Sequence, residues 1–230
     1  MIHKLWLCGA GACLLLITSV AIAGNVIDRI AATVNNRIIL QSDWDDAVNY
    51  EALIGGKSRE QLSDDDRQAV LNRLIDQELL REQMRTTDPQ YAPSDEVVQA
   101  RIQEIRKQYP GGDTQEGWSQ VLARYNLREE DVRNRVVQEL VILYLVEDRL
   151  GSTVQVDDRA VQDYYNQSYL PKLRQSGAKE VPLVEVAPKI RDLLTQQKLN
   201  EALGDWLQNL RESSTIRLSV VRTDDGGQTR

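Results

Sequence analysis

The sequence contains no phenylalanine, and its single histidine and both cysteines lie close to the start of the chain. They are His3, Cys8 and Cys13. From residue 24 onward the chain therefore lacks the side chains of Ser-His-Asp and Cys-His catalysis and the usual nitrogen and sulfur ligands of zinc. Disulfides are excluded there as well, so packing alone has to stabilise this part. These absences favour a protein that binds something over an enzyme.

The first 23 residues have the three parts of a secretory signal peptide: a positive start, an apolar run over residues 5–20, and small residues before the end. The pattern predicts export, with cleavage between Ala23 and Gly24. The apolar run is shorter than the ~20 residues that a membrane-spanning helix needs, which disfavours an uncleaved anchor. A lipoprotein is disfavoured because both cysteines stand early in the run.

Acidic residues outnumber basic ones by 35 to 28, which gives a net charge of −7 at pH 7. Binding of nucleic acid without sequence preference needs a basic face, so this balance argues against it. It argues equally against strong attachment to anionic membranes. The 230 residues are enough for one large domain or two small ones.

Segments at opposite ends of the chain predict β-strands. Residues 27–34 and 37–40 flank Asn35 and Asn36, a pair suited to the positive φ angles of a tight hairpin turn. A lone hairpin is marginal in water, so we expect the strand at 215–221 to join it in one small antiparallel sheet. The alternating residues of that last strand that we expect to face inward are Ile216, Leu218 and Val220.

Everything between these strands is predicted to be helical, so the expected fold class is mainly α, with a small antiparallel sheet joining the N-terminal hairpin and the C-terminal strand. Ser42, Ser63 and Ser94 are placed as N-caps before segments with a 3.6-residue apolar period. The stretch from Val136 to Val146 is apolar on nearly every side, which predicts the central and most buried helix. Later helices are expected from Arg128 to Leu150, from Asp157 through Tyr169, and from Glu185 to Ser213, with a loop over 170–181.

Local motifs for ligands fail on spacing or context. Gly56-Lys57-Ser58 resembles the end of a phosphate-binding loop, but Glu51 stands where the motif needs a glycine. Asp43-Trp44-Asp45 resembles the start of a calcium loop, whose later glycine and glutamate are missing. The carboxylate pairs Glu129-Glu130 and Asp157-Asp158 lie at predicted helix N-termini, where the helix dipole explains them. We therefore expect no nucleotide, metal or other cofactor and no catalytic residues.

A few aromatic residues and a methionine stand out in the otherwise aliphatic helices. Each of them taken alone is explained by core packing. Together, Tyr, Trp and Met suit an adaptable apolar groove that accepts varied peptides, formed between the N-terminal helices and the long C-terminal helix. The candidate peptide-binding residues are Met84, Trp118, Tyr125, Tyr165 and Trp206.

Four segments carry a family resemblance. Residues 27–42, with Asp43 after them, form a hairpin that leads into a helix, and Leu71–Leu80 contains Leu-Ile-Asp. The segments Val156–Tyr165 and Pro182–Leu218 follow. In this order the four pieces resemble the SurA family of periplasmic chaperones.

Members of that family usually carry one or two parvulin prolyl-isomerase domains between the last two pieces, where only Leu170–Val181 stands here. The resemblance therefore implies a periplasmic chaperone module without a parvulin domain. It implies an ATP-independent holdase whose partners are unfolded or nascent exported polypeptides, extended and rich in aromatic residues, such as outer-membrane proteins. The implied organisation is a signal peptide (1–23), a hairpin and helical region (24–169), a loop (170–181), a C-terminal helix and strand completing the same domain (182–222), and a disordered tail (223–230).

Two other functions stay open. One is a dedicated assembly partner of a single envelope protein, which would bind one chain tightly instead of many weakly. The other is a residual prolyl isomerase, which is disfavoured because parvulin sites characteristically use His and Phe.

Overall fold

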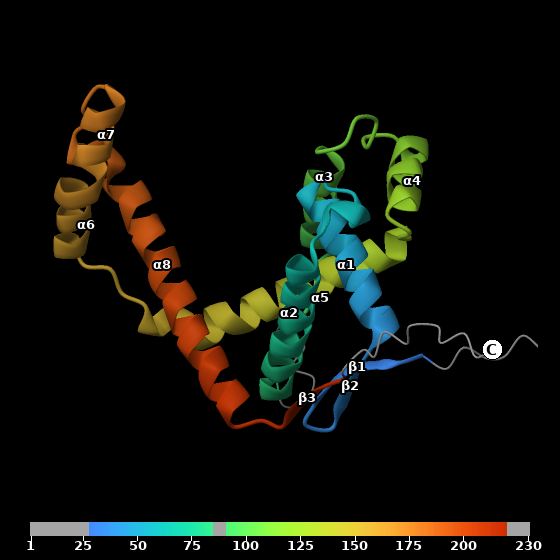
Figure 1. The fold of residues 1–230 in the computed structure, drawn as a ribbon. Helices are drawn as coiled ribbons and strands as arrows, with labels where there is room; N and C mark the ends of the chain where they lie inside the picture. Colours follow the sequence, from blue (N-terminus) through green and yellow to red (C-terminus); the bar gives the residue numbers. More distant parts are fainter. Residues whose placement is uncertain (1–27, 85–90, 220–230) are drawn as a thin grey trace, which may run out of the picture.

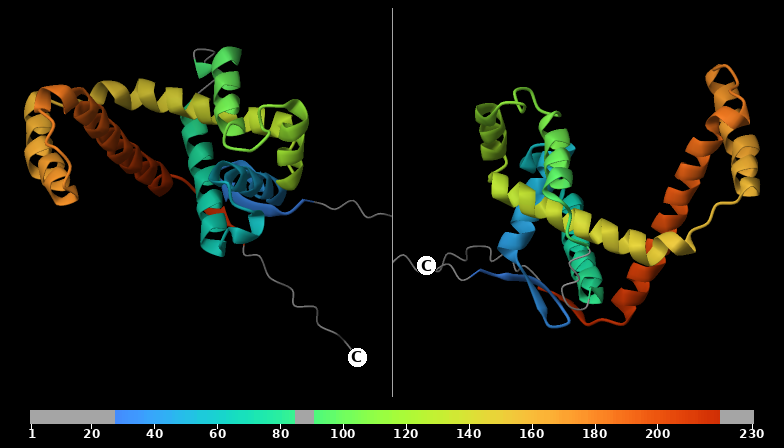
Figure 2. Two further views of the ribbon diagram at one scale, coloured as in Figure 1. Left: turned by 90° about the horizontal axis from the view of Figure 1, so that it is seen from above. Right: turned by 180° about the vertical axis from the view of Figure 1, so that it is seen from behind.

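The computed structural model describes residues 28–84 and 91–219 (Figure 1). The predicted signal peptide, its cleavage site at Ala23 and Gly24, and the predicted tail 223–230 lie outside these ranges. Within them the fold is mainly α with a small three-stranded antiparallel sheet, as predicted. Residues 30–84 and 91–150 and the last strand form a body, and residues 158–190 stand away from it as an arm (Figure 2).

The sheet joins both ends of the described chain. Strands β1 (Ile30–Val34) and β2 (Arg37–Leu40) form the predicted hairpin, and β3 (Ile216–Leu218) pairs with the other side of β1. In the turn, Asn35 has a positive φ of 51° and Asn36 does not, so the expectation of two left-handed residues is wrong. Ile216 packs against the core, but Leu218 is 52% exposed because it lies on a short edge strand. The predicted inward alternation therefore fails at Leu218, and Val220 lies outside the described residues.

Helices α1 (Gln41–Gly55) and α2 (Asp64–Gln83) follow the hairpin, with the single turn η1 (Arg59–Gln61) between them. Ser63 caps α2 as predicted. Ser42 instead lies inside the first turn of α1, because Asp43 already accepts a hydrogen bond from the Leu40 amide at 3.0 Å. One face of α2 packs on the sheet at a spacing of four residues, and burying each such side chain contributes ~1.5–3 kcal/mol. This part of the core contains Ala32, Val34, Ile39, Leu71, Ile75 and Leu79.

The larger part of the core lies between α1, α3 (Asp95–Arg106), α4 (Gln115–Arg124) and the long helix α5 (Glu129–Leu150). At its centre is Trp118, which is fully buried. The buried Arg106 guanidinium lies over the indole ring, 5.6 Å from its centroid. It also donates hydrogen bonds to the carbonyls of Gly112, Asp113 and Thr114. These bonds offset the free-energy cost of burying the charge.

Helix α5 is less buried in its middle than its sequence predicts. Val132 and Val136 are buried in the body, and Leu145 and Val146 are buried near the far end. Between them Leu143 is 45% exposed. The physical reason is that α5 runs from the body to a crossing with the last helix, so its middle bridges two packed regions (Figure 1).

The arm is built from α6 (Asp158–Tyr164), a π-helical turn (Tyr165–Tyr169), α7 (Leu170–Ser176) and the start of α8 (Leu183–Glu212). The single turn η3 (Gly151–Thr153) follows α5. The predicted loop over 170–181 is therefore wrong for its first part, which is helical. Pro171 lies in the first turn of α7, where a missing N–H costs nothing. Gly177, with φ 69°, ends the helix.

Candidate functional site

The five predicted peptide-binding residues do not lie together. Trp118 belongs to the core and Tyr125 lies beside it at the C-cap of α4, where its ring meets Tyr109 edge-on at 6.0 Å. Because Trp118 has no exposed surface, core packing explains it and it does not line an open groove in this conformation. Tyr125 is partly buried, and its hydroxyl accepts a hydrogen bond of 3.2 Å from the Tyr109 hydroxyl.

The other three residues lie in three further places. Met84 is the partly buried C-cap of α2. Tyr165 lies in the arm, stacks on Tyr169 at 5.7 Å, and donates a hydrogen bond to the Val181 carbonyl at 2.8 Å. Trp206 on α8 lies next to Arg149 near the end of α5. The Arg149 guanidinium is 5.9 Å from the centroid of its ring.

Among the described residues, the large apolar side chains that are exposed are aliphatic, and none of them is among the five predicted residues. Leu143 lies on α5, and Val184 and Leu193 lie on α8, with exposed fractions of 45%, 80% and 41%. Ile38 on β2 is 56% exposed. Their exposure could not be predicted from the local sequence, because each belongs to an apolar pattern that is equally typical of a helix or strand face buried in the core.

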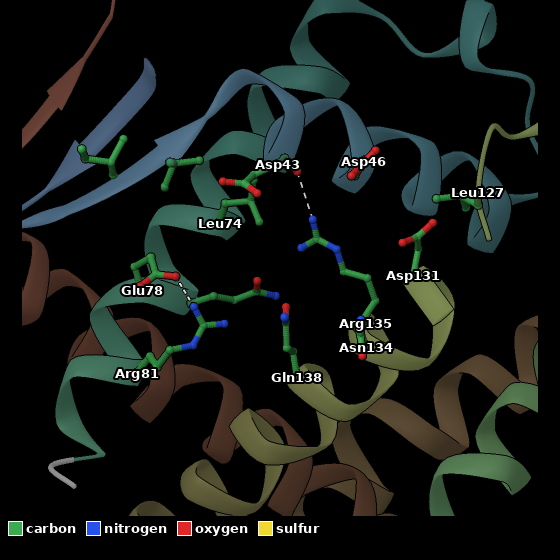
Figure 3. A pocket seen from close by; sticks show the side chains of 13 residues that line it. Asp43, Asp46, Leu74, Glu78, Arg81, Leu127, Asp131, Asn134, Arg135 and Gln138 are labelled. Atoms are coloured by element: carbon green, nitrogen blue, oxygen red, sulfur yellow. Dashed lines mark hydrogen bonds and ion pairs between the residues drawn. The ribbon is translucent and has the colours of Figure 1, made fainter. Parts of the chain in front are cut away.

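A polar cleft of about 300 Å³ opens between β2, α1, α2 and α5 (Figure 3). Helix α2 contributes Gln77, Glu78 and Arg81 on one side, and α5 contributes residues from the opposite side. We call this feature the polar cleft. Its remaining lining residues are Ile38, Ile39, Asp43, Asp46, Leu74, Leu127, Asp131, Asn134, Arg135 and Gln138.

Arg135 is the central cation of the polar cleft. Its Nη2 donates a hydrogen bond to the Asp43 carbonyl at 3.0 Å, which ties α5 to the start of α1. Within the part of the chain that the structure describes, this is the only hydrogen bond of the Arg135 side chain, and no carboxylate lies within ion-pair distance of its guanidinium. A guanidinium carries five N–H donors, so most of them remain available. Burial lowers the pKa of Arg135, although Asp46 and the other nearby carboxylates oppose this.

The carboxylates of the polar cleft have unequal surroundings. Loss of water raises the pKa of Asp46, and the nearby charge of Asp131 raises it further. The pKa of Asp131 is lowered, chiefly because its carboxylate accepts hydrogen bonds from the Arg128 side chain. Glu78 is paired with Arg81 within α2. Among the described residues, no group of three or more His, Cys, Asp or Glu side chains is arranged to hold a metal ion.

Two further hollows adjoin the polar cleft along α5. A hollow of about 40 Å³ is lined by Arg135 and Glu139, and Tyr50 of α1 lies across it. The Tyr50 hydroxyl donates a hydrogen bond to the Glu139 carboxylate at 3.2 Å, while loss of water raises the pKa of that carboxyl. On the other side, a more open depression of about 470 Å³ shares Asp46, Leu127 and Asp131 with the cleft. Hollows therefore open at three places where residues of α1 and α5 face each other.

Sequence reasoning missed the polar cleft for a definable reason. Asp43 and Asp46 fit the acidic first turn that a helix dipole favours, and Arg135 fits the solvated face of an amphipathic helix. Their meeting depends on how α5 packs against α1, which no local pattern encodes.

The comparisons with known proteins agree on one family. A sequence profile of the SurA-like N-terminal domain matches residues 4–146 of this chain. The Chaperone SurA of Escherichia coli O6:H1 (strain CFT073) is 30% identical over 122 residues, and that of Salmonella typhimurium (strain LT2) is 31% identical over 122 residues. Each match covers 52% of this chain but only 28% of the relative. The matched part thus makes up little more than a quarter of these curated relatives.

The helices that the structure describes were considered as membrane spans only by their length and apolarity. None of them is both long enough and apolar enough to cross a bilayer.

Proposed function

The chain belongs to the SurA-like N-terminal domain family, and from this premise we propose that it is a periplasmic chaperone that holds unfolded polypeptides without using ATP. Family membership supports the chaperone role. The periplasmic location rests on the sequence of the first 23 residues, which has the form of a signal peptide.

The observation that carries the proposal is the exposed apolar surface of α5 and α8. Leu143 on α5 is 45% exposed, Leu193 on α8 is 41% exposed, and Val184 at the start of α8 is 80% exposed. A passive holdase needs apolar surface that stays accessible, because its clients are recognised by the apolar side chains that folding would bury.

The surface charge complements this role. A net charge of −7 keeps a protein with exposed aliphatic side chains soluble and reduces its self-association. We propose that the clients are extended, aromatic-rich chains such as unfolded outer-membrane proteins. Aliphatic side chains on α5 and α8 would contact their aromatic rings.

The direct test is suppression of aggregation. The chain starting at Gly24 is mixed in several-fold molar excess with an unfolded outer-membrane β-barrel, without nucleotide, and light scattering is followed over time. We expect aggregation to be delayed, and we expect Leu143→Ser with Leu193→Ser to remove most of the delay. Asp163→Ser, a change at an exposed position on the arm, is the control and should act like the original chain. No delay by the original chain would contradict the holdase proposal and favour a dedicated partner of a single protein.

We also propose that the protein is not an enzyme. A protease-coupled prolyl-isomerase assay, run beside a parvulin, should show no catalysis that scales with this chain through successive purification steps. Activity that follows the protein quantitatively would overturn this part of the proposal.

A further inference from the structure

We infer that the polar cleft binds the main chain of an extended polypeptide. The inference rests on the proposed function for the nature of the ligand, and on the cleft for the place and the mode of binding. It assigns sequence-independent recognition to Gln77, Asn134, Arg135 and Gln138, and it separates this contact from the apolar surface of α5 and α8.

The first argument is the number of unused polar groups. Gln77 on α2, and Asn134 and Gln138 on α5, line the cleft, and their side-chain amides have no hydrogen-bond partner among the described residues. Arg135 uses a single donor. Each amide offers two donors and an acceptor, so the cleft presents many unpaired groups of both kinds from two facing helices (Figure 3).

The second argument is the balance of charge. An anionic ligand would meet Asp43, Asp46 and Asp131, and a cationic one would meet Arg135, so each would face a like charge. Among the described residues the carboxylates of Asp43, Glu78 and Asp131 already accept bonds from the Leu40 amide, Arg81 and Arg128, which leaves Asp46 as the one cleft carboxylate without such a bond. A neutral amide group fits better, because its C=O accepts from a guanidinium or an amide while its N–H donates to a carboxylate or an amide. The main chain of an extended polypeptide repeats that pair of groups at every residue.

The third argument is the apolar border. Leu74 and Leu127 line the cleft among its polar groups, and Ile38 on the edge strand β2 is 56% exposed beside it. In an extended chain successive side chains point to opposite sides, so alternate ones would lie against this border while the main chain lies in the cleft. Such binding tolerates varied client sequences, as main-chain recognition does elsewhere.

The test uses the chain starting at Gly24 and a short fluorescein-labelled peptide of alternating tyrosine and serine residues. Binding is measured by fluorescence anisotropy. The key variant combines Gln77→Leu with Gln138→Leu, which removes two amides of the cleft at nearly constant volume and breaks no hydrogen bond among the described residues. Gln103→Leu, on an exposed face of α3, is the matched control.

We expect the double variant to weaken binding about tenfold, since unpaired main-chain groups would be left in the cleft, while the control binds like the original chain. A peptide of the same sequence with N-methyl groups on alternate amides should bind the original chain about tenfold more weakly. Asn134→Trp, which blocks the exposed mouth of the cleft and leaves the bond from Arg135 to the Asp43 carbonyl in place, should weaken binding equally. Melting curves of all variants identify any that fail to fold.

The outcomes separate the two proposals. If the double variant and Asn134→Trp fold and bind the peptide as tightly as the original chain, the cleft does not bind main chain, although the holdase proposal stands if aggregation is still delayed. Equal binding of the N-methylated peptide would overturn the inference in the same way. Binding lost when the peptide's C-terminus is amidated would show recognition of a carboxylate and also overturn it. Failure of the original chain both to bind peptide and to delay aggregation would contradict the proposed function itself.

Discussion

Asn35 and Thr215, 180 residues apart, bond to each other in both directions. The Asn35 backbone N–H donates to the Thr215 carbonyl at 2.8 Å, and the Thr215 backbone N–H donates to the Asn35 side-chain oxygen at 2.8 Å. The Asn35 side-chain nitrogen also donates to Glu82 at the end of α2 and to Ser214. One turn residue thus joins the hairpin, α2 and the link from α8 to β3.

Asn35→Ala is expected to lower the free energy of unfolding by about 1–3 kcal/mol, because it removes these side-chain bonds and places Ala at a positive φ. Asn35→Gly loses the same bonds but accepts the φ, so it should lower it less. Urea unfolding of both variants measures the difference. Equal losses would show that backbone conformation contributes nothing at this turn.

Removal of β3 is expected to destabilise the body. Ending the chain after Ser213 deletes the strand that pairs with β1 and removes Ile216 from the core, so the melting temperature should fall by many degrees. A chain ending after Ser219 keeps all three strands and is the matched control. The role assigned to β3 would be wrong if both truncated chains melted together.

Alanine substitutions at two helical glycines should change the stability of the protein in opposite directions. A Cβ on Gly117 would lie 2.1 Å from the Gly111 carbonyl oxygen, which is backbone and cannot move aside without distorting the loop before α4. Gly117→Ala should therefore be strongly destabilising. A Cβ on Gly204 of α8 meets nothing within 4 Å, so Gly204→Ala should stabilise by up to about 1 kcal/mol through helix propensity. Thermal melts of both variants test the pair, and a stable Gly117→Ala would contradict the close packing of α4.

Replacing Trp118 or Trp206 by alanine should lower the free energy of unfolding by different amounts. Trp118→Ala empties the centre of the core and is expected to cost about 3–5 kcal/mol. Trp206 is only partly buried beside Arg149, so Trp206→Ala should cost less than half of that. Denaturant unfolding gives both values, and peptide binding by the folded Trp206→Ala variant shows whether this residue contacts clients. A small loss for Trp118→Ala would return it to the list of groove residues.

Two carboxyls of α5 should give opposite dependences of stability on pH. The pKa of Glu139 is raised above its ordinary 4.5, mainly by loss of water, so its contribution to stability is present below 4.5 and is lost as pH rises through the higher folded pKa. Glu139→Gln should therefore stabilise the protein at about pH 7 and have little effect at about pH 4. The pKa of Asp131 is lowered from 3.8 by its bonds to Arg128, so its contribution is present above 3.8 and is lost as pH falls through the lower folded pKa.

Asp131→Asn should accordingly destabilise at about pH 7, and the difference from the original chain should shrink in acid. Urea midpoints of the two variants at both pH values check the signs. If Glu139→Gln changed the urea midpoint by the same amount at both pH values, titration of the Glu139 carboxyl would not be linked to folding.

The local elements could be predicted because they depend on residues within a few positions of each other. Alternation around Asn35 and Asn36 predicted the hairpin, and the cap at Ser63 predicted the start of α2. The third strand followed from the requirement that a two-stranded hairpin needs further pairing. The helix α7 was missed because Pro171 and Gly177, which suggest a loop, are also compatible with the first turn and the end of a short helix.

The sequence by itself determined the order of the strands and long helices, the small sheet that joins both ends, the acidic charge and the family, because each follows from composition, periodicity or local motifs. Only the tertiary structure decided which apolar residues are exposed and which polar ones meet. Trp118 and Trp206 follow the same helical pattern, yet one is at the centre of the core and the other lies next to Arg149 near the end of α5. The polar cleft likewise exists only because α5 packs across α1 and α2 and places Arg135 beneath Asp43. Burial and side-chain meeting depend on contacts between residues far apart in the chain, and a local pattern carries no information about those contacts.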